Sequence, residues 1–174
     1  MPKVVAKGKH FPYVRAVKKR SPTICPIVFS LDIFGDRWSL VILRDILLRN
    51  KSHFREFLAS EEKIASNILS DRLESLVRDG LLTRESDAAN KSAAIYKPTE
   101  KALALLPMLF ELMRWGIVYN HNVDTNGPVM RQLTSDPEGL HASIMEKFRH
   151  QDAVERTPDS LRVPGRRAPP NMRL

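Results

Sequence analysis

Apolar residues recur at helical spacing through the middle of the chain and then give way to the pattern of a hairpin. The helical positions are Ile64, Ile68, Leu69, Leu73, Leu76 and Val77. Gly80 follows directly, and glycine is the usual residue where a helix ends in a left-handed turn. The pattern predicts an amphipathic helix over residues 65–79, then two strands at residues 81–86 and 93–97 joined by a polar turn at 87–92.

Helical patterns also precede this segment. Residues 26–34 predict a short helix stopped by Gly35, and residues 37–49 predict a strongly apolar helix. Its inward positions are expected to be Trp38, Val41, Ile42, Ile46 and Leu47. Ser52 stands where an N-cap is expected for a short helix that carries Phe54, Phe57 and Leu58.

Further helices are predicted after the hairpin. Thr99 is expected to cap a long helix over residues 100–120, and the Asn-Gly-Pro run at 126–128 breaks the chain. Ser135 and Glu138, with Pro137 between them, predict a capping box for a last helix that ends near Arg149. The proline-rich sequence from Gln151 onward is expected to be disordered.

Helix, glycine and hairpin in this order are typical of a winged helix-turn-helix. The predicted fold class is mostly α with a small β-hairpin wing, a winged helix-turn-helix domain with extra C-terminal helices. Four segments are expected: a basic flexible arm at 1–24, the winged-helix domain for DNA binding and dimerisation at 25–122, a C-terminal helical extension at 123–150, and the disordered tail at 151–174.

The polar side of the helix over residues 65–79 begins with short side chains. Ser66, Asn67 and Ser70 are expected to face bases or phosphates, because a major groove excludes bulk and offers donors and acceptors on base edges. Asn67 is the best candidate for direct readout, since its amide can pair bidentately with adenine. Arg72 would either reach a phosphate or pair with an acid in the same helix. The alternative for the whole face is an ordinary solvated helix surface.

Two other places carry candidate binding residues. Asn90 and Lys91 lie at the predicted wing tip, where Lys91 would contact a phosphate or would simply be a solvated turn lysine. Trp38 and Trp115 are expected to pack in the core or in a dimer interface, with ligand stacking as the alternative.

The positive charge is concentrated at the two ends of the chain. Of the formal net charge of +8, residues 1–24 carry +7 with no acid, residues 150–174 carry +2, and the body between them carries −1. A basic chain favours a nucleic-acid partner. The basic arm would follow the phosphate backbone or a minor groove, or it would be a solubilising tail.

Composition and motifs argue against several other classes. The single cysteine cannot form a disulfide within the chain, which favours a reducing cytoplasm. The N-terminus lacks the apolar core of a secretory signal, and we expect no apolar run to be long enough to span a bilayer. The sequence has no glycine-rich phosphate loop, and its five histidines do not cluster at metal-ligand spacing. We therefore expect no enzyme activity, no cofactor, no metal and no membrane partner.

An ordered set of motifs covers about Cys25 to Tyr119. They are Cys25-Pro26, Gly35-Asp36-Arg37-Trp38-Ser39-Leu40-Val41-Ile42-Leu43-Arg44-Asp45-Ile46-Leu47, His53-Phe54-Arg55-Glu56-Phe57, Leu69-Ser70-Asp71-Arg72-Leu73, Asp79-Gly80-Leu81-Leu82, Tyr96-x-x-Thr99 and Trp115-Gly116. In these motifs and their spacing the chain resembles the HxlR-type winged helix-turn-helix transcription regulators.

The resemblance implies a cytoplasmic homodimer that binds a near-palindromic operator. It places the recognition helix at 65–79 and the wing at 82–97, with dimer contacts from the first helix and from the long helix after the wing. Some positions depart from the family pattern. Ala65 stands where the family usually has a serine cap, and Lys63 stands where glycine is common. His53 replaces an arginine, so Arg55 is expected to take over its phosphate contact.

Cys25 is the one residue with thiol chemistry. It precedes Pro26 at a predicted helix N-terminus, and Lys18, Lys19 and Arg20 lie nearby in the sequence, so both the helix dipole and the cations favour the thiolate form. The resemblance implies that cysteine is frequent here and that some members use it to sense oxidants or electrophiles. The alternative is a buried cysteine that only packs.

The sequence therefore predicts a sequence-specific double-stranded DNA-binding regulator. Its expected partners are DNA, a second copy of the chain, and a thiol-reactive or small-molecule effector. The alternative is a protein-interaction module that uses a winged-helix scaffold without specific DNA binding.

Overall fold

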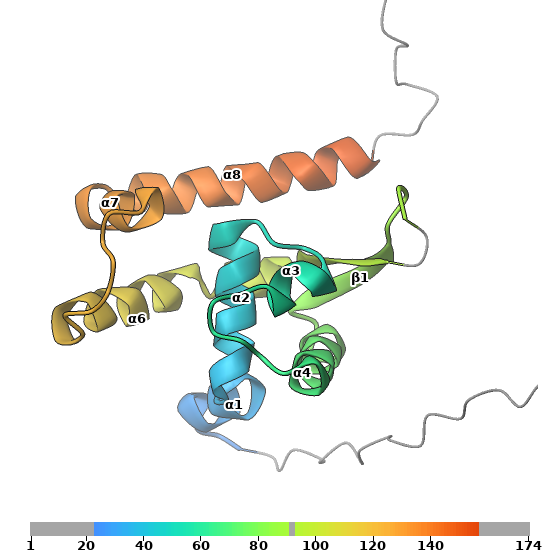
Figure 1. Cartoon of the computed structure of the whole chain (residues 1–174), viewed down its shortest axis with the longest axis horizontal. Helices are drawn as coiled ribbons and strands as arrows, with labels where there is room; N and C mark the ends of the chain where they lie inside the picture. Colours follow the sequence, from blue (N-terminus) through green and yellow to red (C-terminus); the bar gives the residue numbers. More distant parts are fainter. Residues whose placement is uncertain (1–22, 91–92, 157–174) are drawn as a thin grey trace, which may run out of the picture.

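The computed structural model describes residues 23–90 and 93–156, with side chains described up to residue 150. The elements are, in order, α1 (Pro26–Phe34), α2 (Arg37–Arg49), α3 (Phe54–Leu58), α4 (Ser66–Arg78), β1 (Leu82–Ser86), β2 (Ala94–Pro98), α5 (Glu100–Leu103), α6 (Leu106–Tyr119), α7 (Pro128–Ser135) and α8 (Pro137–Arg156). The strands pair in a single antiparallel hairpin (Figure 1). The predicted mostly α fold with a small hairpin is confirmed. The arm expected at 1–24 and the tail beyond Arg156 lie almost entirely outside the described residues.

The first two helices begin and end as the sequence predicts. The backbone N–H of Gly35 closes α1 on the Leu31 carbonyl at 2.8 Å, and a Cβ at this position would lie 2.4 Å from that same oxygen. Asp36 caps α2 by accepting hydrogen bonds from the backbone N–H groups of Trp38 and Ser39 at 2.9 and 3.0 Å. Only a glycine therefore allows α1 and α2 to meet at this tight corner.

The prediction for the start of α3 is wrong by one residue. His53 is the N-cap, and Ser52 precedes it. The Glu56 carboxylate reaches back and accepts from the backbone N–H groups of Ser52 and His53, at 2.7 and 2.8 Å. The acid in the first turn thus reaches back to the N-cap backbone N–H, as the Glu of a capping box does.

Helix α4 confirms the central amphipathic pattern. Its inward residues Leu69, Leu73 and Leu76 are fully buried. It ends in a Schellman motif: the N–H of Leu81 donates to the Leu76 carbonyl at 2.9 Å, while Gly80 adopts a φ of 71°. This sharp reversal leads the chain directly from α4 into β1.

The long helix expected over residues 100–120 is broken into α5 and α6. Pro107 lacks an N–H, and its ring would clash with the carbonyl of Leu103 in a continuous helix. Thr99 stands at the N-cap of α5 but does not accept a capping bond; its hydroxyl donates to the carbonyls of Gly80 and Leu81, at 2.7 and 3.1 Å. Thr99 therefore ties the start of α5 to the end of α4.

The C-terminal part contains one more helix than predicted. The break at 126–128 is followed at once by α7, and Ser135 ends that helix. The predicted capping box is wrong, because the Asp136 carboxylate, not Ser135, accepts from the N–H of Gly139 at 2.9 Å. Helix α8 runs to Arg156, past the boundary expected at residue 151.

Two adjacent hydrophobic clusters hold the chain together. The first joins α1–α4 and the hairpin through Phe34, Ile42, Leu43, Phe57, Leu69, Leu73, Leu82 and Tyr96, with Trp38 partly buried against it. The second joins α6, α7 and α8 to the end of α2 through Leu47, Leu106, Phe110, Leu133, Leu140 and Phe148. Figure 1 shows α2 between α8 on one side and α1 and α4 on the other.

One stretch contradicts the expectation about bilayer-spanning runs. Residues Glu100–Tyr119 have the length and the mean hydropathy, 1.4, of a membrane span. Core helices of soluble proteins meet the same criterion, and Leu106, Leu109 and Phe110 of this stretch are indeed buried in the second cluster. Length and hydropathy are therefore weak evidence for a membrane span here.

Candidate nucleic-acid interface

Helices α3 and α4, with the turn between them, form the helix-turn-helix. Phe57 from α3 and Leu69 from α4 are buried on the inner side, so the opposite side of α4 is turned to solvent. Ser66, Asn67 and Ser70 all lie on that exposed side. Their side chains form no hydrogen bond with any residue that the structure describes. Three short polar groups at the start of α4 are thus available to a partner.

The N-terminus of α4 is weakly capped. Ala65 is the N-cap and has no side-chain oxygen to accept from the first N–H groups. Just before it, the exposed Lys63 adopts a φ of 54°, a left-handed conformation that suits glycine better. Lys63 was not among the predicted contacts, although a cation directly before the recognition helix was visible in the sequence.

Arg72 has a partner that the sequence did not predict. Its Nη1 lies 3.3 Å from the Asp36 Oδ2, an acid at the start of α2 and not in the same helix. Burial by itself would raise the pKa of Asp36, but hydrogen bonds from Ser39 and the charge of Arg72 hold it below the ordinary value. Arg72 therefore helps to hold α4 against the beginning of α2.

The wing presents an exposed polar edge. Thr83, Arg84, Glu85 and Ser86 of β1 are exposed, and Lys97 of β2 pairs with Glu85 at 2.7 Å across the hairpin. Asn90 at the tip is exposed and has its own interaction within the protein. Lys91 lies outside the described residues. Like Lys63, Arg84 is an exposed cation that the sequence prediction did not include.

The start of α3 is connected to the wing by His53. Its Nδ1 lies 2.9 Å from the Ser52 hydroxyl and 3.5 Å from Glu56, and its Nε2 lies 3.3 Å from the Asp87 carboxylate at the end of β1. Arg55 is exposed and forms no ion pair with any described residue. The helix-turn-helix and the wing are thus joined by side chains as well as by sequence.

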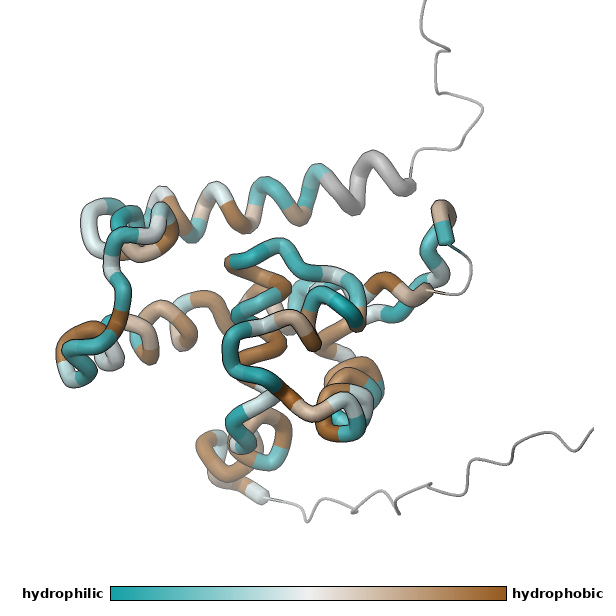
Figure 2. The backbone as a smooth tube through the Cα atoms, viewed as in Figure 1, coloured by the Kyte–Doolittle hydropathy of each residue, from teal (hydrophilic) through white to brown (hydrophobic). Residues whose placement is uncertain are grey.

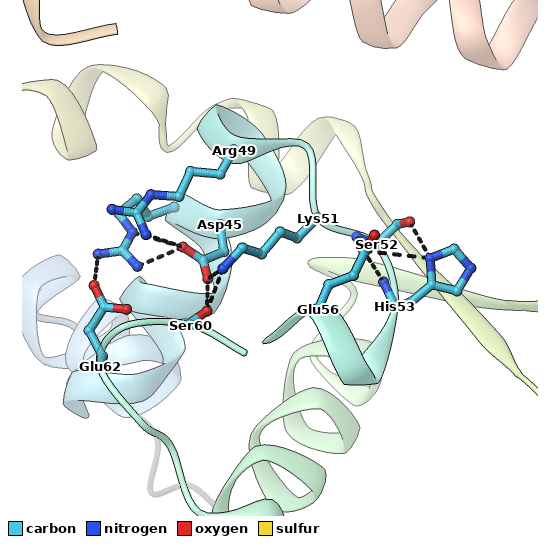
Figure 3. Close-up of polar contacts among 9 residues, drawn as sticks. Asp45, Arg49, Lys51, Ser52, His53, Glu56, Ser60 and Glu62 are labelled. Carbon is cyan, nitrogen blue, oxygen red and sulfur yellow. Dashed lines mark hydrogen bonds and ion pairs between the residues drawn. The ribbon is translucent and has the colours of Figure 1, made fainter. Parts of the chain in front are cut away.

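A buried carboxylate anchors the turn behind the recognition helix. The Asp45 side chain is only 2% exposed and receives three short contacts: Arg44 at 2.6 Å, Lys51 at 2.9 Å and the Ser60 hydroxyl at 2.5 Å (Figure 3). Arg44 also bonds Glu62 at 2.5 Å. These residues come from α2 and from the segments on both sides of α3, so one carboxylate holds three parts of the chain together.

The contacts of Asp45 also set its charge. Burial alone would raise its pKa, but hydrogen bonds from Ser60, Lys51 and Arg44 lower the pKa below the ordinary value. The sequence signal for this cluster is Asp45 itself, a single acid among the apolar residues of 37–49. The cluster positions the helix-turn-helix and is not itself open to DNA.

Large apolar residues are exposed on α6, on α1 and directly before α1, and together they are called the apolar surface here. They are Ile24, Ile27, Val28, Phe29, Leu31, Leu112, Trp115, Val118 and Tyr119. Figure 2 shows hydrophobic colouring on both helices. Trp115, 66% exposed, is not a core residue of one chain. Exposed apolar surface of this extent marks an interaction site.

Cys25 lies at the edge of this apolar surface. It is the N-cap of α1 and is exposed, so the buried-packing interpretation does not hold within one chain. Its backbone N–H donates to the Thr23 hydroxyl at 3.1 Å. The cations at residues 18–20 that were expected beside it lie outside the described residues. Within the described part of the chain, no three His, Cys, Asp or Glu residues are placed to hold a metal.

Comparisons with known proteins point in one direction. The model of the HxlR-like helix-turn-helix family matches residues 33–124. The uncharacterized HTH-type transcriptional regulator YdeP of Bacillus subtilis (strain 168) is 32% identical over 100 residues, which cover 58% of this chain and 77% of that protein. A solved structure, PA1607, described as a candidate transcription factor, is 34% identical with a TM-score of 0.52, covering 60% of this chain and 70% of the other. Helices α7 and α8 lie beyond the part that the family model matches.

Proposed function

Because the chain belongs to the HxlR-like helix-turn-helix family of transcriptional regulators, we propose that it binds a specific double-stranded DNA operator in the cytoplasm as a homodimer. The observation that carries the proposal is the open polar start of α4. Ser66, Asn67 and Ser70 are exposed and form no side-chain hydrogen bond with any described residue. In contrast, the buried Asp45 carboxylate behind the helix-turn-helix is paired within the protein.

In the proposed complex, α4 enters the major groove with its first turns against the bases. Asn67 pairs its amide with an adenine, and Ser66 and Ser70 bond base edges or phosphates. The weak cap at Ala65 leaves backbone N–H groups at the helix start, where a DNA phosphate is favoured by the helix dipole. Specificity then rests on α4, and affinity rests mainly on the surrounding cations.

Contacts to the phosphate backbone come from both sides of α4. Arg55 and Lys63 flank the helix start, and Asn90 with Lys91 contact the backbone from the wing. Arg72 acts by holding α4 through Asp36, with its remaining donors able to reach a phosphate. The basic arm at residues 1–24 adds long-range attraction, since it carries +7 while the body carries −1.

The homodimer is proposed to form through α1 and α6. Both helices expose large apolar residues, including Phe29 and Trp115, that one chain leaves uncovered. A two-fold axis through this surface would present two copies of α4 to a near-palindromic site. Sedimentation should give about twice the chain mass of 19.9 kDa. Val118→Asp should shift the protein to monomers, whereas Glu111→Gln on the same helix should not.

The DNA proposal is tested by selecting oligonucleotides from a random pool and then titrating the preferred site across salt concentrations. The expected result is one enriched, near-palindromic motif and an affinity that falls steeply with salt, by about 0.9 in log–log slope for each phosphate contacted. A protein-interaction module without specific DNA binding would give no enriched motif. That outcome would overturn the proposal.

We further propose that a thiol-reactive signal modulates the regulator through Cys25. The thiol is exposed beside the apolar surface, so the two copies in a dimer would lie in the same interface. Hydrogen peroxide would take two electrons and two protons from two Cys25 thiols, forming one disulfide between subunits and two waters. Non-reducing gels and DNA affinity before and after peroxide, with Cys25→Ser as control, test this. Identical affinity in both states would contradict it.

A further inference from the structure

A cleft of about 430 Å³ lies between α8 and the winged-helix body. Its walls come from the end of α2, the segment that leads to α3, strand β2 and residues 147–150 of α8. Figure 1 shows α8 passing above the end of α2. Ile46, Tyr96, Pro98 and Phe148 line it with apolar and aromatic surface. This volume and lining are within the range of small-molecule sites in proteins.

The polar residues that line the cleft are three lysines together with Asn50, Ser52 and His150. Lys51 and Lys97 line it, but each is bound to a carboxylate: Lys51 to Asp45 at 2.9 Å, and Lys97 to Glu85 at 2.7 Å. These carboxylates neutralise both ammonium groups. They leave the remaining lysine in the wall, on α8, as the group that decides which ligand the cleft accepts.

Lys147 differs from the other two lysines. It lines the cleft and is half-buried, yet it forms no ion pair with any residue in the described part of the chain. Its Nζ lies 5.1 Å from the centre of the Phe148 ring. Burial lowers the pKa of the Lys147 ammonium, and no acid among the residues whose side chains are described counters that effect. A bound anion would stabilise this partly dehydrated charge.

We propose that this cleft binds a small organic anion, with its carboxylate on Lys147 and an aromatic or aliphatic body against Tyr96 and Phe148. The apolar lining of the cleft disfavours a purely inorganic anion, which would lose hydration without gaining contact. The site depends on α8, which lies beyond the matched family region of residues 33–124.

The position of the cleft gives the ligand a route to the DNA-binding surface. Strand β2 forms one wall and is half of the wing, and Lys51 connects another wall to the buried Asp45 behind the helix-turn-helix. A ligand that bridges α8 and β2 would favour one placement of the wing over others. This coupling, unlike the binding site itself, rests on the proposed function.

The binding test uses two probes of the same shape on the full chain. Naphthalene-2-carboxylate and its neutral analogue naphthalene-2-carboxamide are titrated by calorimetry in the absence of DNA. We expect the carboxylate to bind at least about tenfold more tightly than the carboxamide. Equal affinities, or no binding of the carboxylate, would overturn the proposal.

Two variants that each replace a cation of α8 by methionine locate the site. Lys147→Met keeps an unbranched side chain and removes the charge, and it should weaken carboxylate binding at least about tenfold while leaving the carboxamide unchanged. Arg149→Met, a matched loss of charge on α8 outside this cleft, should leave both unchanged. Equal losses in the two variants would show that binding is not at Lys147. Circular dichroism confirms that both remain folded, and Lys147→Gln replaces Lys147→Met if it does not.

A separate arm measures DNA affinity with and without saturating naphthalene-2-carboxylate. A change that is absent in Lys147→Met supports the coupling to the wing. An unchanged DNA affinity despite measured binding overturns the coupling. Because calorimetry needs no DNA, failure of the ligand site and failure of the DNA proposal are distinguishable.

Discussion

The two sides of the helix-turn-helix differ in how their polar groups are satisfied. Behind it, Asp45 is 2% exposed and its carboxylate is bonded by Arg44, Lys51 and Ser60. In front, Ser66 and Asn67 of α4 are exposed and have no bond within the described protein. The two groups lie in neighbouring parts of one small fold.

The difference teaches how to separate structural from functional polarity in this domain. A buried polar group that leaves water must be paired, and the pairing then fixes the surrounding segments. A polar group that stays exposed contributes little to folding and is free to bond a partner. Substitutions on the two sides should therefore fail in different assays: stability for Asp45, and recognition for α4.

The largest expected effect is on stability. Asp45→Asn should lower the free energy of unfolding by about 3 kcal/mol, the low end for breaking a buried ion pair, because Arg44 and Lys51 keep some access to water. Denaturant titration measures this. Asp71→Asn on the exposed face of α4 is the matched control and should change stability by less than about 0.5 kcal/mol. Equal effects would contradict the comparison.

The effect of Asp45→Asn on stability should depend on pH. The folded pKa of Asp45 is below the ordinary value, so its contribution to stability is present above the unfolded pKa of about 3.9 and is lost as the pH falls through the folded pKa. The stability gap between wild type and Asp45→Asn should thus be full at neutral pH and should narrow below about pH 4. A gap that stays constant down to pH 2 would argue against the charged carboxylate as the cause.

On the recognition side, Asn67→Ala should weaken binding to the preferred operator by about 1–3 kcal/mol and relax base preference at one position in each half-site. Its unfolding free energy should stay close to that of wild type. Asn122→Ala, an exposed asparagine after α6, is the control. An Asn67→Ala protein with unchanged specificity would show that another residue performs the readout.

A smaller effect is expected from the N-cap of α4. Ala65→Ser should stabilise the protein by about 1 kcal/mol, because the hydroxyl would accept a hydrogen bond from a first-turn N–H. Thermal melting measures the gain. Ala89→Ser in the wing is a control with the same chemical change and no helix to cap. A gain of equal size in both would exclude capping as the cause.

The smallest effect concerns the left-handed residue before α4. Lys63→Gly should gain between zero and about 1 kcal/mol of stability, since relief of the φ of 54° is partly offset by a more flexible unfolded chain. It should also weaken DNA binding through the lost charge. Asn50→Gly, at a φ of 59°, is the matched position and should gain less, because asparagine tolerates this conformation.

Local patterns predicted most of the winged-helix elements. The inward stripe of α4 and the Gly80 stop depend on residues close together in sequence, and both are present in the structure. Predictions failed where a residue had a choice of partners. Ser52 and Ser135 were expected to cap helices, but His53 and Asp136 hold those positions. Thr99 does stand at the predicted N-cap of α5, but its hydroxyl donates to the Gly80 carbonyl and accepts no capping bond. A capping residue in the sequence is only one of several neighbouring groups that can bond the free N–H groups at a helix start, and the sequence does not show which one does.

The sequence by itself determined the family, the order of the elements from α1 to β2 and the exposed polar start of α4, because periodicity, helix stops and motif spacing are properties of neighbouring residues. Only the tertiary structure decided that Arg72 pairs with Asp36, that Asp45 gathers Lys51 and Ser60, and that α8 closes a cleft against β2. These contacts join residues far apart along the chain. Their partners are chosen by the packing of helices, which no local pattern encodes.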